Sequence, residues 1–215
     1  VSNFKEKVDD AGENVTKIAI VGRPNVGKSS LVNRLLGSER VVVSNVEGTT
    51  RDAVLVPFKY NKQNFALVDT AGLRRQRAVE RESVEGYSVL RTMSAIDEAD
   101  IVLIVIDGSQ EIISEQDVRI AGYVDEAGKP SVIVVNKWDI KSKNKPDYLK
   151  MLSQNLAFMD YFQVIFVSAL TGESIGQIME LALKSYENSS KRITTGLLND
   201  LLAQAVLNYQ PPAHN

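Results

Sequence analysis

Eight residues at positions 22–29 have the pattern Gly-x-x-x-x-Gly-Lys-Ser. The apolar run 17–21 precedes them and a helical pattern follows, which is the strand-loop-helix setting that this motif requires. The two glycines allow backbone N–H groups to turn toward a chain of phosphates, and the start of a helix attracts the same negative charge. Lys28 adds a mobile positive charge, while the Ser29 hydroxyl can bind Mg²⁺. The residues expected at the phosphates are Gly22, Arg23, Pro24, Asn25, Val26, Gly27, Lys28, Ser29 and Ser30.

A second cluster, Asp-Thr-Ala-Gly at 69–72, ends the expected strand 65–69. Asp69 can hold Mg²⁺ directly or through water, although an acidic residue here can also cap a helix. Gly72 leaves its backbone N–H free to approach a γ-phosphate closely. Because ligands of parallel sheets lie at the carboxyl ends of the strands, we expect this cluster beside the phosphate loop.

Two clusters further along the chain have residue types that suit a guanine base. In Asn-Lys-Trp-Asp at 136–139, the Asp139 carboxylate can accept hydrogen bonds from the ring N–H and the exocyclic amine of guanine, a pair of donors that adenine lacks. Asn136 can bond the purine or tie the phosphate loop to this segment, and the aliphatic stem of Lys137 can cover a base face. The Ser-Ala pair at 168–169 can present a backbone N–H to the guanine carbonyl oxygen.

The hydrophobic pattern alternates between short β-branched runs and helical periods, which predicts a three-layer α/β domain. We expect six strands in a mostly parallel sheet, with one antiparallel strand where a polar turn joins two neighbouring runs. The strands are expected at 18–21, 53–60, 65–69, 101–107, 131–136 and 164–168, and the helices at 28–37, 84–96, 114–127, 147–157, 175–187 and 195–208.

The composition excludes several classes of protein. The 215 residues include no cysteine and a single histidine, His214, so disulfides, thiolate nucleophiles, zinc ribbons and Ser-His-Asp triads are excluded. A net charge of −2 argues against a strongly basic nucleic-acid binder. No apolar run reaches the roughly 18 residues that span a bilayer, and the N-terminus lacks a signal-peptide pattern. We therefore expect a soluble, cytoplasmic protein without a membrane span.

The motifs, in this order, resemble those of a translation-factor-class GTPase and most closely the EngA/Der family of bacterial ribosome-assembly GTPases. Gly-Thr-Thr-Arg-Asp at 48–52 matches the threonine-containing loop of such proteins. Three segments resemble the second of the two tandem GTPase domains in that family: 82–91, 136–139 and 190–193. The resemblance covers about 17–210.

The resemblance implies a domain organisation. Residues 1–16 would be a linker, 17–190 a GTPase domain with the P-loop GTPase fold, and 191–215 a C-terminal helix leading to a KH-like domain that this chain lacks. The helical pattern at 194–208 has leucines at helical spacing, which favours a packing helix over a membrane anchor.

The resemblance also implies ligands and their binding residues. The cofactors would be GTP or GDP, Mg²⁺ and K⁺. Lys28, Asn25, Thr50 and Gly72 would take part in hydrolysis, and Ser29, Thr50 and Asp69 would bind Mg²⁺, with Thr49 as the alternative to Thr50. Beyond the phosphate loop, the nucleotide would be bound by Asp69, Thr70, Ala71, Gly72, Leu73, Asn136, Lys137, Trp138, Asp139, Ser168, Ala169 and Leu170.

We interpret the chain as a GTP/GDP switch, with switch segments at about 40–52 and 69–92. Its hydrolysis would gate binding of the full-length protein to the large ribosomal subunit, the other domains of the same chain would be partners, and the isolated chain would be monomeric. The alternative is a nucleotide-regulated scaffold with incidental hydrolysis.

Leu73 keeps that alternative open, because signalling GTPases have at this position a glutamine that orients the attacking water. We expect K⁺, held by Asn25 and the backbone of 44–49, to supply the missing positive charge, although the Asn25 side chain can instead cap the loop. The arginines between Arg74 and Arg81 can act as arginine fingers, contact RNA or form a solvated face.

Overall fold

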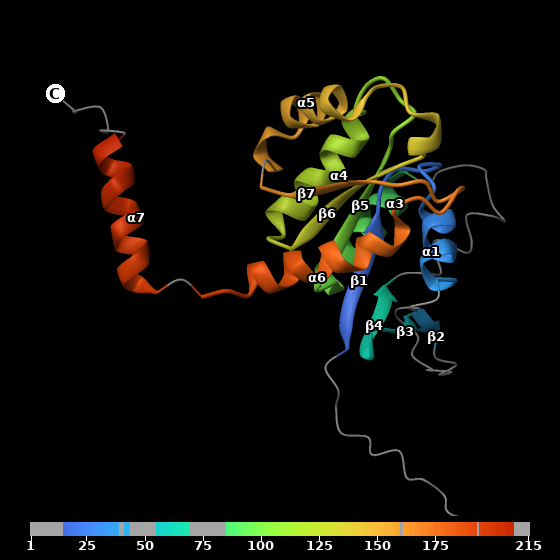
Figure 1. Cartoon of the computed structure of the whole chain (residues 1–215), viewed down its shortest axis with the longest axis horizontal. Helices are drawn as coiled ribbons and strands as arrows, with labels where there is room; N and C mark the ends of the chain where they lie inside the picture. Colours follow the sequence, from blue (N-terminus) through green and yellow to red (C-terminus); the bar gives the residue numbers. More distant parts are fainter. Residues whose placement is uncertain are drawn as a thin grey trace, which may run out of the picture.

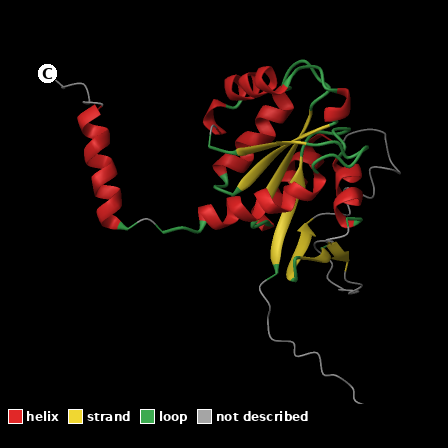
Figure 2. Cartoon of the chain, viewed as in Figure 1, coloured by secondary structure: helices red, strands yellow, loops and turns green. Residues whose placement is uncertain are grey.

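The computed structural model describes residues 15–38, 41–43, 55–68, 85–159, 161–192 and 194–208. In this part of the chain a seven-stranded sheet lies between two layers of helices (Figures 1 and 2). The strands are β1 (Thr16–Val21), β2 (Val41–Val43), β3 (Val56–Tyr60), β4 (Gln63–Val68), β5 (Ile101–Asp107), β6 (Ser131–Asn136) and β7 (Gln163–Phe166). The predicted three-layer α/β architecture is confirmed.

The strand order is β2-β3-β4-β1-β5-β6-β7. β3 is antiparallel to β2 and β4, and every other pair is parallel, so β3 is the one reversed strand among the described residues. The predicted strand number was too low by one, because β2 was missed. Three residues are too few to show a period, and β2 exists through its pairing with β3.

The sheet is buried on both faces, which explains the continuous apolar runs of its central strands. Along β5, Ile101, Leu103 and Val105 pack into one hydrophobic cluster, while the alternate side chains Val102 and Ile104 pack into the other. Each cluster is buried only when helices pack over it. The alternation of β5 side chains between the two clusters therefore fixes the register of β5 against both helical layers.

Helices α1 (Lys28–Leu36) and α6 (Ile178–Ser189) cover one face of the sheet. Helices α3 (Glu85–Glu98), α4 (Glu115–Glu126) and α5 (Lys145–Asn155) lie on the other face. Three 3₁₀ turns accompany them: η1 (Trp138–Ile140), η2 (Ala157–Met159) and η3 (Ile175–Gln177). α5 begins two residues before its predicted start, because Asn144 caps it and Pro146 suits a first turn.

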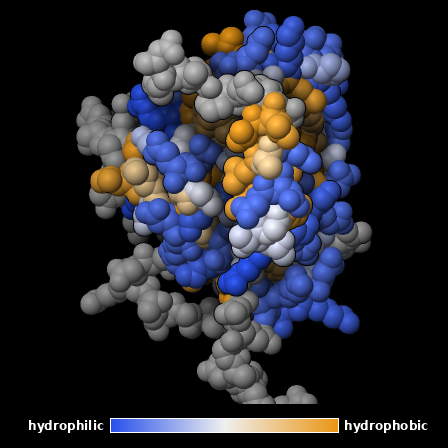
Figure 3. Space-filling view, turned by 90° about the vertical axis from the view of Figure 1, so that its left-hand side faces the viewer, coloured by the Kyte–Doolittle hydropathy of each residue, from blue (hydrophilic) through white to orange (hydrophobic). Residues whose placement is uncertain are grey.

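Helix α7 (Thr195–Asn208) agrees with the predicted range, and its expected role as a packing helix stays a prediction. Its described side chains are exposed, so none of the described residues covers its leucines. Figure 3 faces the side of the molecule that carries α7 and shows hydrophobic residues at the surface among hydrophilic ones. Among the described helices, none is long and apolar enough to cross a membrane.

The turn between β3 and β4 contains two residues with positive φ, Asn61 at 48° and Lys62 at 68°. Hairpin turns of this kind favour glycine at the second position, because an L side chain is strained there. We predict that Lys62→Gly raises the free energy of unfolding by about 0.5–1 kcal/mol, measured by urea denaturation. As a control, glycine at the exposed strand position Lys59 should lower it. A destabilised Lys62→Gly protein would contradict the prediction.

Candidate nucleotide-binding site

The phosphate loop between β1 and α1 is pressed against two neighbouring strands. Gly22 and Gly27 have φ of 149° and 96°. A Cβ on Gly22 would collide with the carbonyl oxygen of Val105 on β5, and a Cβ on Gly27 with the side-chain amide of Asn136 on β6. Both glycines of the motif are therefore required by close approach as well as by backbone angle.

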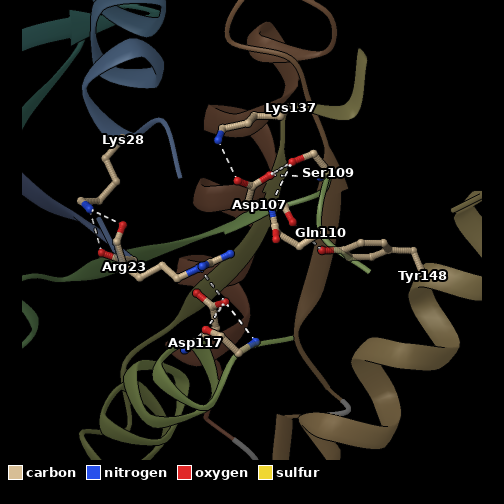
Figure 4. Close-up of polar contacts among 10 residues, drawn as sticks. Arg23, Lys28, Asp107, Ser109, Gln110, Asp117, Lys137 and Tyr148 are labelled. Carbon is tan, nitrogen blue, oxygen red and sulfur yellow. Dashed lines mark hydrogen bonds and ion pairs between the residues drawn. The ribbon is translucent and has the colours of Figure 1, made fainter. Parts of the chain in front are cut away.

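The Lys28 side chain is hydrogen bonded to the backbone of the phosphate loop. Its Nζ donates to the carbonyl oxygens of Gly22 at 2.7 Å and of Arg23 at 2.8 Å, as Figure 4 shows. Burial lowers the pKa of this ammonium from 10.5 to about 8, against the opposing influence of the negative charge on Asp117. The positive charge is thus held at the N-terminus of α1, where an anion binds most readily.

Arg23 anchors the phosphate loop to α4. Its Nε lies 3.1 Å from Oδ2 of Asp117, an ion pair without a hydrogen bond between these atoms. Asp117 is 2% exposed and also accepts hydrogen bonds from the N–H and the hydroxyl of Ser114, the N-cap of α4. One carboxylate therefore fixes both the start of α4 and the residue whose carbonyl holds Lys28.

Asn136 joins three strand-end segments. Its Nδ2 donates to the carbonyl oxygen of Val26 in the phosphate loop at 2.9 Å, and its Oδ1 accepts the N–H of Ala169 at 3.0 Å. The side chain is 1% exposed, so both hydrogen bonds are shielded from water. The sequence left two roles open for Asn136, and the structure shows the one in which it ties the phosphate loop to this segment.

Lys137 forms an ion pair that the sequence analysis did not identify. Its Nζ lies 2.7 Å from Oδ2 of Asp107, the last residue of β5. Burial disfavours the charged carboxylate, but the hydrogen bonds from Lys137 and from Ser109 outweigh it and hold the pKa of Asp107 below its ordinary value. The position of Asp107 at a strand end was the available signal. Figure 4 shows the pair beside Tyr148, whose hydroxyl donates to the Asp107 carbonyl.

Trp138 packs beneath this segment. It is 3% exposed, with its ring 4.3 Å from that of Phe166 and 5.4 Å from that of Tyr148. Its backbone N–H donates to the carbonyl oxygen of Val167. The buried indole holds η1 in place, and the next residue, Asp139, is exposed at the surface.

A pocket of about 530 Å³ lies between the phosphate loop, the 136–140 segment and the 168–172 loop. Its size is that of a site for a small organic ligand. The pocket brings together segments that are more than 100 residues apart in the sequence, and Asp139 is among its lining groups. The lining residues are Gly27, Ser30, Asn33, Arg34, Asn136, Lys137, Asp139, Ile140, Ala169 and Leu170.

The 168–172 loop differs from the expectation in one respect. The N–H of Ser168 donates to the carbonyl of Glu173, and the N–H of Ala169 donates to Asn136. These two groups are therefore already used within the protein. Among the described residues the N–H of Leu170 has no partner, so Leu170 is the candidate donor left free for a guanine oxygen, and the role of the Ser-Ala pair toward a ligand stays a prediction.

Several predicted site residues lie outside the described residues. They are Thr49, Thr50, Asp69, Thr70, Ala71, Gly72 and Leu73, together with the arginines from Arg74 to Arg81. Within the phosphate loop, Pro24 and Asn25 are exposed, Val26 is buried, and Ser29 is on the first turn of α1. Their roles toward a ligand stay predictions.

Comparison with known proteins agrees with this geometry. A family model described as "50S ribosome-binding GTPase" matches residues 17–137, which is more than half of the chain. The chain belongs to the 50S ribosome-binding GTPase family. The predicted resemblance to EngA/Der proteins is confirmed as well: a protein named GTPase Der from Thermoanaerobacter sp. (strain X514) is 50% identical over 204 residues. That alignment covers 94% of this chain and 46% of the relative, so the chain spans about half the length of the curated relatives it matches.

Two solved structures of Era have the same GTPase fold. One is a complex of Era with MgGDPNP and nucleotides 1506–1542 of 16S ribosomal RNA, with a TM-score of 0.58 and 28% identity. It covers 80% of this chain and 57% of that chain. The other, an Era variant from Aquifex aeolicus bound to GDP·AlF4⁻, has the same TM-score and identity and covers 80% of this chain and 56% of that one.

The lowered pKa of Lys28 predicts that GDP binding weakens at alkaline pH. Below a pH of about 8 the ammonium is protonated before the phosphates arrive, whereas above it binding must also take up a proton. We expect the Kd for GDP to rise by up to about tenfold per pH unit beyond this point. Binding titrations with GDP at several pH values between 7 and 9 measure this change in Kd.

Lys28→Arg is the control, because arginine stays charged over this range. It also corrects for titration of the guanine ring itself. Lys28→Ala should bind GDP far more weakly than the wild type and retain its helical content. A Kd for GDP with the same pH profile in the wild type and in Lys28→Arg would contradict the prediction.

Proposed function

We propose that this domain binds GTP and GDP, hydrolyses GTP and acts as a switch in assembly of the large ribosomal subunit. The observation that carries the proposal is the buried Asn136, which holds the phosphate loop and the 168–172 loop around one pocket. A phosphate-binding loop and a carboxylate that can read guanine are thereby placed on two sides of one ligand-sized space.

Asp139 supplies base selectivity in this proposal. It is exposed in the pocket and accepts the two adjacent N–H donors of guanine. Lys137 is held against Asp107, so its aliphatic stem is fixed beside the pocket and can cover a face of the base. Recognition of the neighbouring oxygen at C6 falls to the N–H of Leu170.

The phosphate half of the site suits a triphosphate with Mg²⁺. Lys28 is already positioned at the loop, and Ser29 contributes a hydroxyl on the first turn of α1, which fits a hard cation that prefers oxygen ligands. Thr50 and Asp69 would complete the set of protein ligands, and the Gly72 N–H would contact the γ-phosphate. When bound, Mg²⁺ neutralises charge on the β- and γ-phosphates.

The link to the ribosome rests on the family and on relatives about twice as long as this chain. The full-length protein would carry further domains, with 1–16 as a linker and 191–215 leading to a KH-like domain. The exposed leucines of α7 are consistent with a helix whose partner surface lies outside the described residues. A monomeric state and a cytoplasmic location stay predictions.

The rival function is a nucleotide-regulated scaffold whose hydrolysis is incidental. Leu73, in place of a water-orienting glutamine, is the feature that favours it. Single-turnover hydrolysis of GTP by this chain separates the two. A rate no faster than that of GTP in buffer would support the scaffold.

Base selectivity is the first test. GDP should bind about 10⁴–10⁵-fold more tightly than ADP, because a site built for paired hydrogen bonds leaves them unmade with the wrong base. Asp139→Asn should weaken GDP binding and favour xanthosine diphosphate, whose additional carbonyl accepts from the amide. Asp200→Asn, on exposed α7, is the matched control and should change neither affinity. Tight ADP binding by the wild type would refute the proposal.

A K⁺ ion is the proposed source of the positive charge that Leu73 cannot supply. Asn25 is exposed in the phosphate loop with φ of 65°, and its side chain makes no hydrogen bond within the described residues. A capping role would use that side chain, so its carbonyl oxygen is available to a large monovalent cation. The backbone of 44–49 would provide further oxygens.

We predict that K⁺ raises the rate of GTP hydrolysis above the rate in Na⁺ at equal ionic strength. The developing charge between the β- and γ-phosphates needs a compensating cation, and the loss of one such group typically costs about 10²–10³-fold in rate. Asn25→Ala should abolish the difference between the salts. Equal wild-type rates with saturating GTP and Mg²⁺ would instead direct attention to the arginines from Arg74 to Arg81.

A further inference from the structure

Arg34, in the last turn of α1, holds the 168–172 loop from the outside. Its Nη2 donates to the carbonyl oxygen of Leu170 at 2.6 Å, and its Nε donates to that of Ala169 at 3.3 Å. Both acceptors are consecutive peptide carbonyls, which match the planar fork of donors of a guanidinium group. The residue also lines the pocket.

The remaining hydrogen bonds of this loop involve other groups. The N–H of Ala169 is taken by Asn136, that of Thr171 by the Ser168 hydroxyl, and that of Gly172 by the Ser168 carbonyl. In the described part of the chain, Arg34 is the partner of the carbonyls at 169 and 170. The peptide between these two carbonyls contains the N–H of Leu170, which is left for a ligand.

We propose that Arg34 is a positioning residue for base specificity: it fixes the Leu170 peptide so that its N–H can read the oxygen at C6 of guanine. The inference rests on the proposed function of the pocket. Its physical basis is that α1 carries the phosphate loop at its N-terminus and Arg34 near its C-terminus. One rigid helix thus sets the spacing between the phosphate contacts and the base contact.

Gly172 agrees with this arrangement. It has φ of 91°, and a Cβ there would lie 3.6 Å from the guanidinium of Arg34, an ordinary contact distance. The guanidinium therefore packs beside the backbone of Gly172. Lysine at position 34 would have a single point charge and could satisfy only part of this contact.

The test compares GDP with two analogues, 6-thio-GDP and IDP, each of which differs from GDP at one position of the base. 6-Thio-GDP changes the oxygen at C6 to sulfur, a weak acceptor, and IDP lacks the exocyclic amine that Asp139 would bind. In Arg34→Ala, GDP affinity should fall by about three- to tenfold, the loss of one well-placed neutral hydrogen bond. The preference for GDP over 6-thio-GDP should shrink by the same factor, whereas the preference for GDP over IDP should not change.

Two further variants make the result specific. Arg34→Lys should recover part of the preference for GDP over 6-thio-GDP. This variant takes the place of Arg34→Ala in the test if the alanine variant is unstable. Arg119→Ala is the matched control, because Arg119 is an exposed arginine on α4 with no hydrogen bond or ion pair among the described residues. It should leave all three affinities unchanged, and urea unfolding of each variant reports whether the fold is retained.

The outcomes separate the inference from the proposed function. If Arg34→Ala weakens all three diphosphates equally, or weakens none, Arg34 does not position the base contact and the inference is overturned. If the wild type itself does not prefer GDP to ADP, the proposed function fails instead.

Discussion

The site depends on one buried side chain that hydrogen bonds in two directions. Asn136 donates to the phosphate loop and accepts from the 168–172 loop, with almost no exposure to solvent. Removing it would leave a buried carbonyl and a buried N–H without partners, and each such group costs about 1–3 kcal/mol. Gly27 follows from the same contact, because a side chain there would collide with the Asn136 amide.

The phosphate loop is thereby held from three sides. β5 limits it at Gly22, β6 through Asn136, and α4 through the Arg23–Asp117 ion pair. These contacts come from two strands of the sheet and from a helix on one of its faces. The loop is consequently a preorganised part of the fold, and its backbone N–H groups need little rearrangement to meet an anion.

Much of this architecture could be predicted from the sequence, for reasons that are local. β5 and β6 have the predicted boundaries because their apolar runs end at polar residues, and the phosphate loop lies in its expected strand-loop-helix setting. β2 could not be predicted, since it is three valines stabilised by a neighbouring strand. The roles of Arg34 and Asp107 could not be predicted for a similar reason. Their partners are 136 and 30 residues away in the chain, and their residue types are ordinary for a helix surface and a strand end.

The same limit explains the Ser168–Ala169 expectation. The sequence identified the right loop, but which N–H remains free depends on Asn136 and Glu173, whose contacts arise only in the folded chain. Local patterns locate a loop. Tertiary hydrogen bonds decide which of its groups a ligand can use.

Trp138 gives the site an optical property of its own. It is the only tryptophan among the 215 residues, and it is buried next to Phe166 and Tyr148, one residue before Asp139. The ammonium of Lys141 lies 5.6 Å from its ring. All intrinsic tryptophan emission of this chain therefore originates next to the candidate base contact, and a change in its intensity or wavelength reports on the surroundings of this one ring.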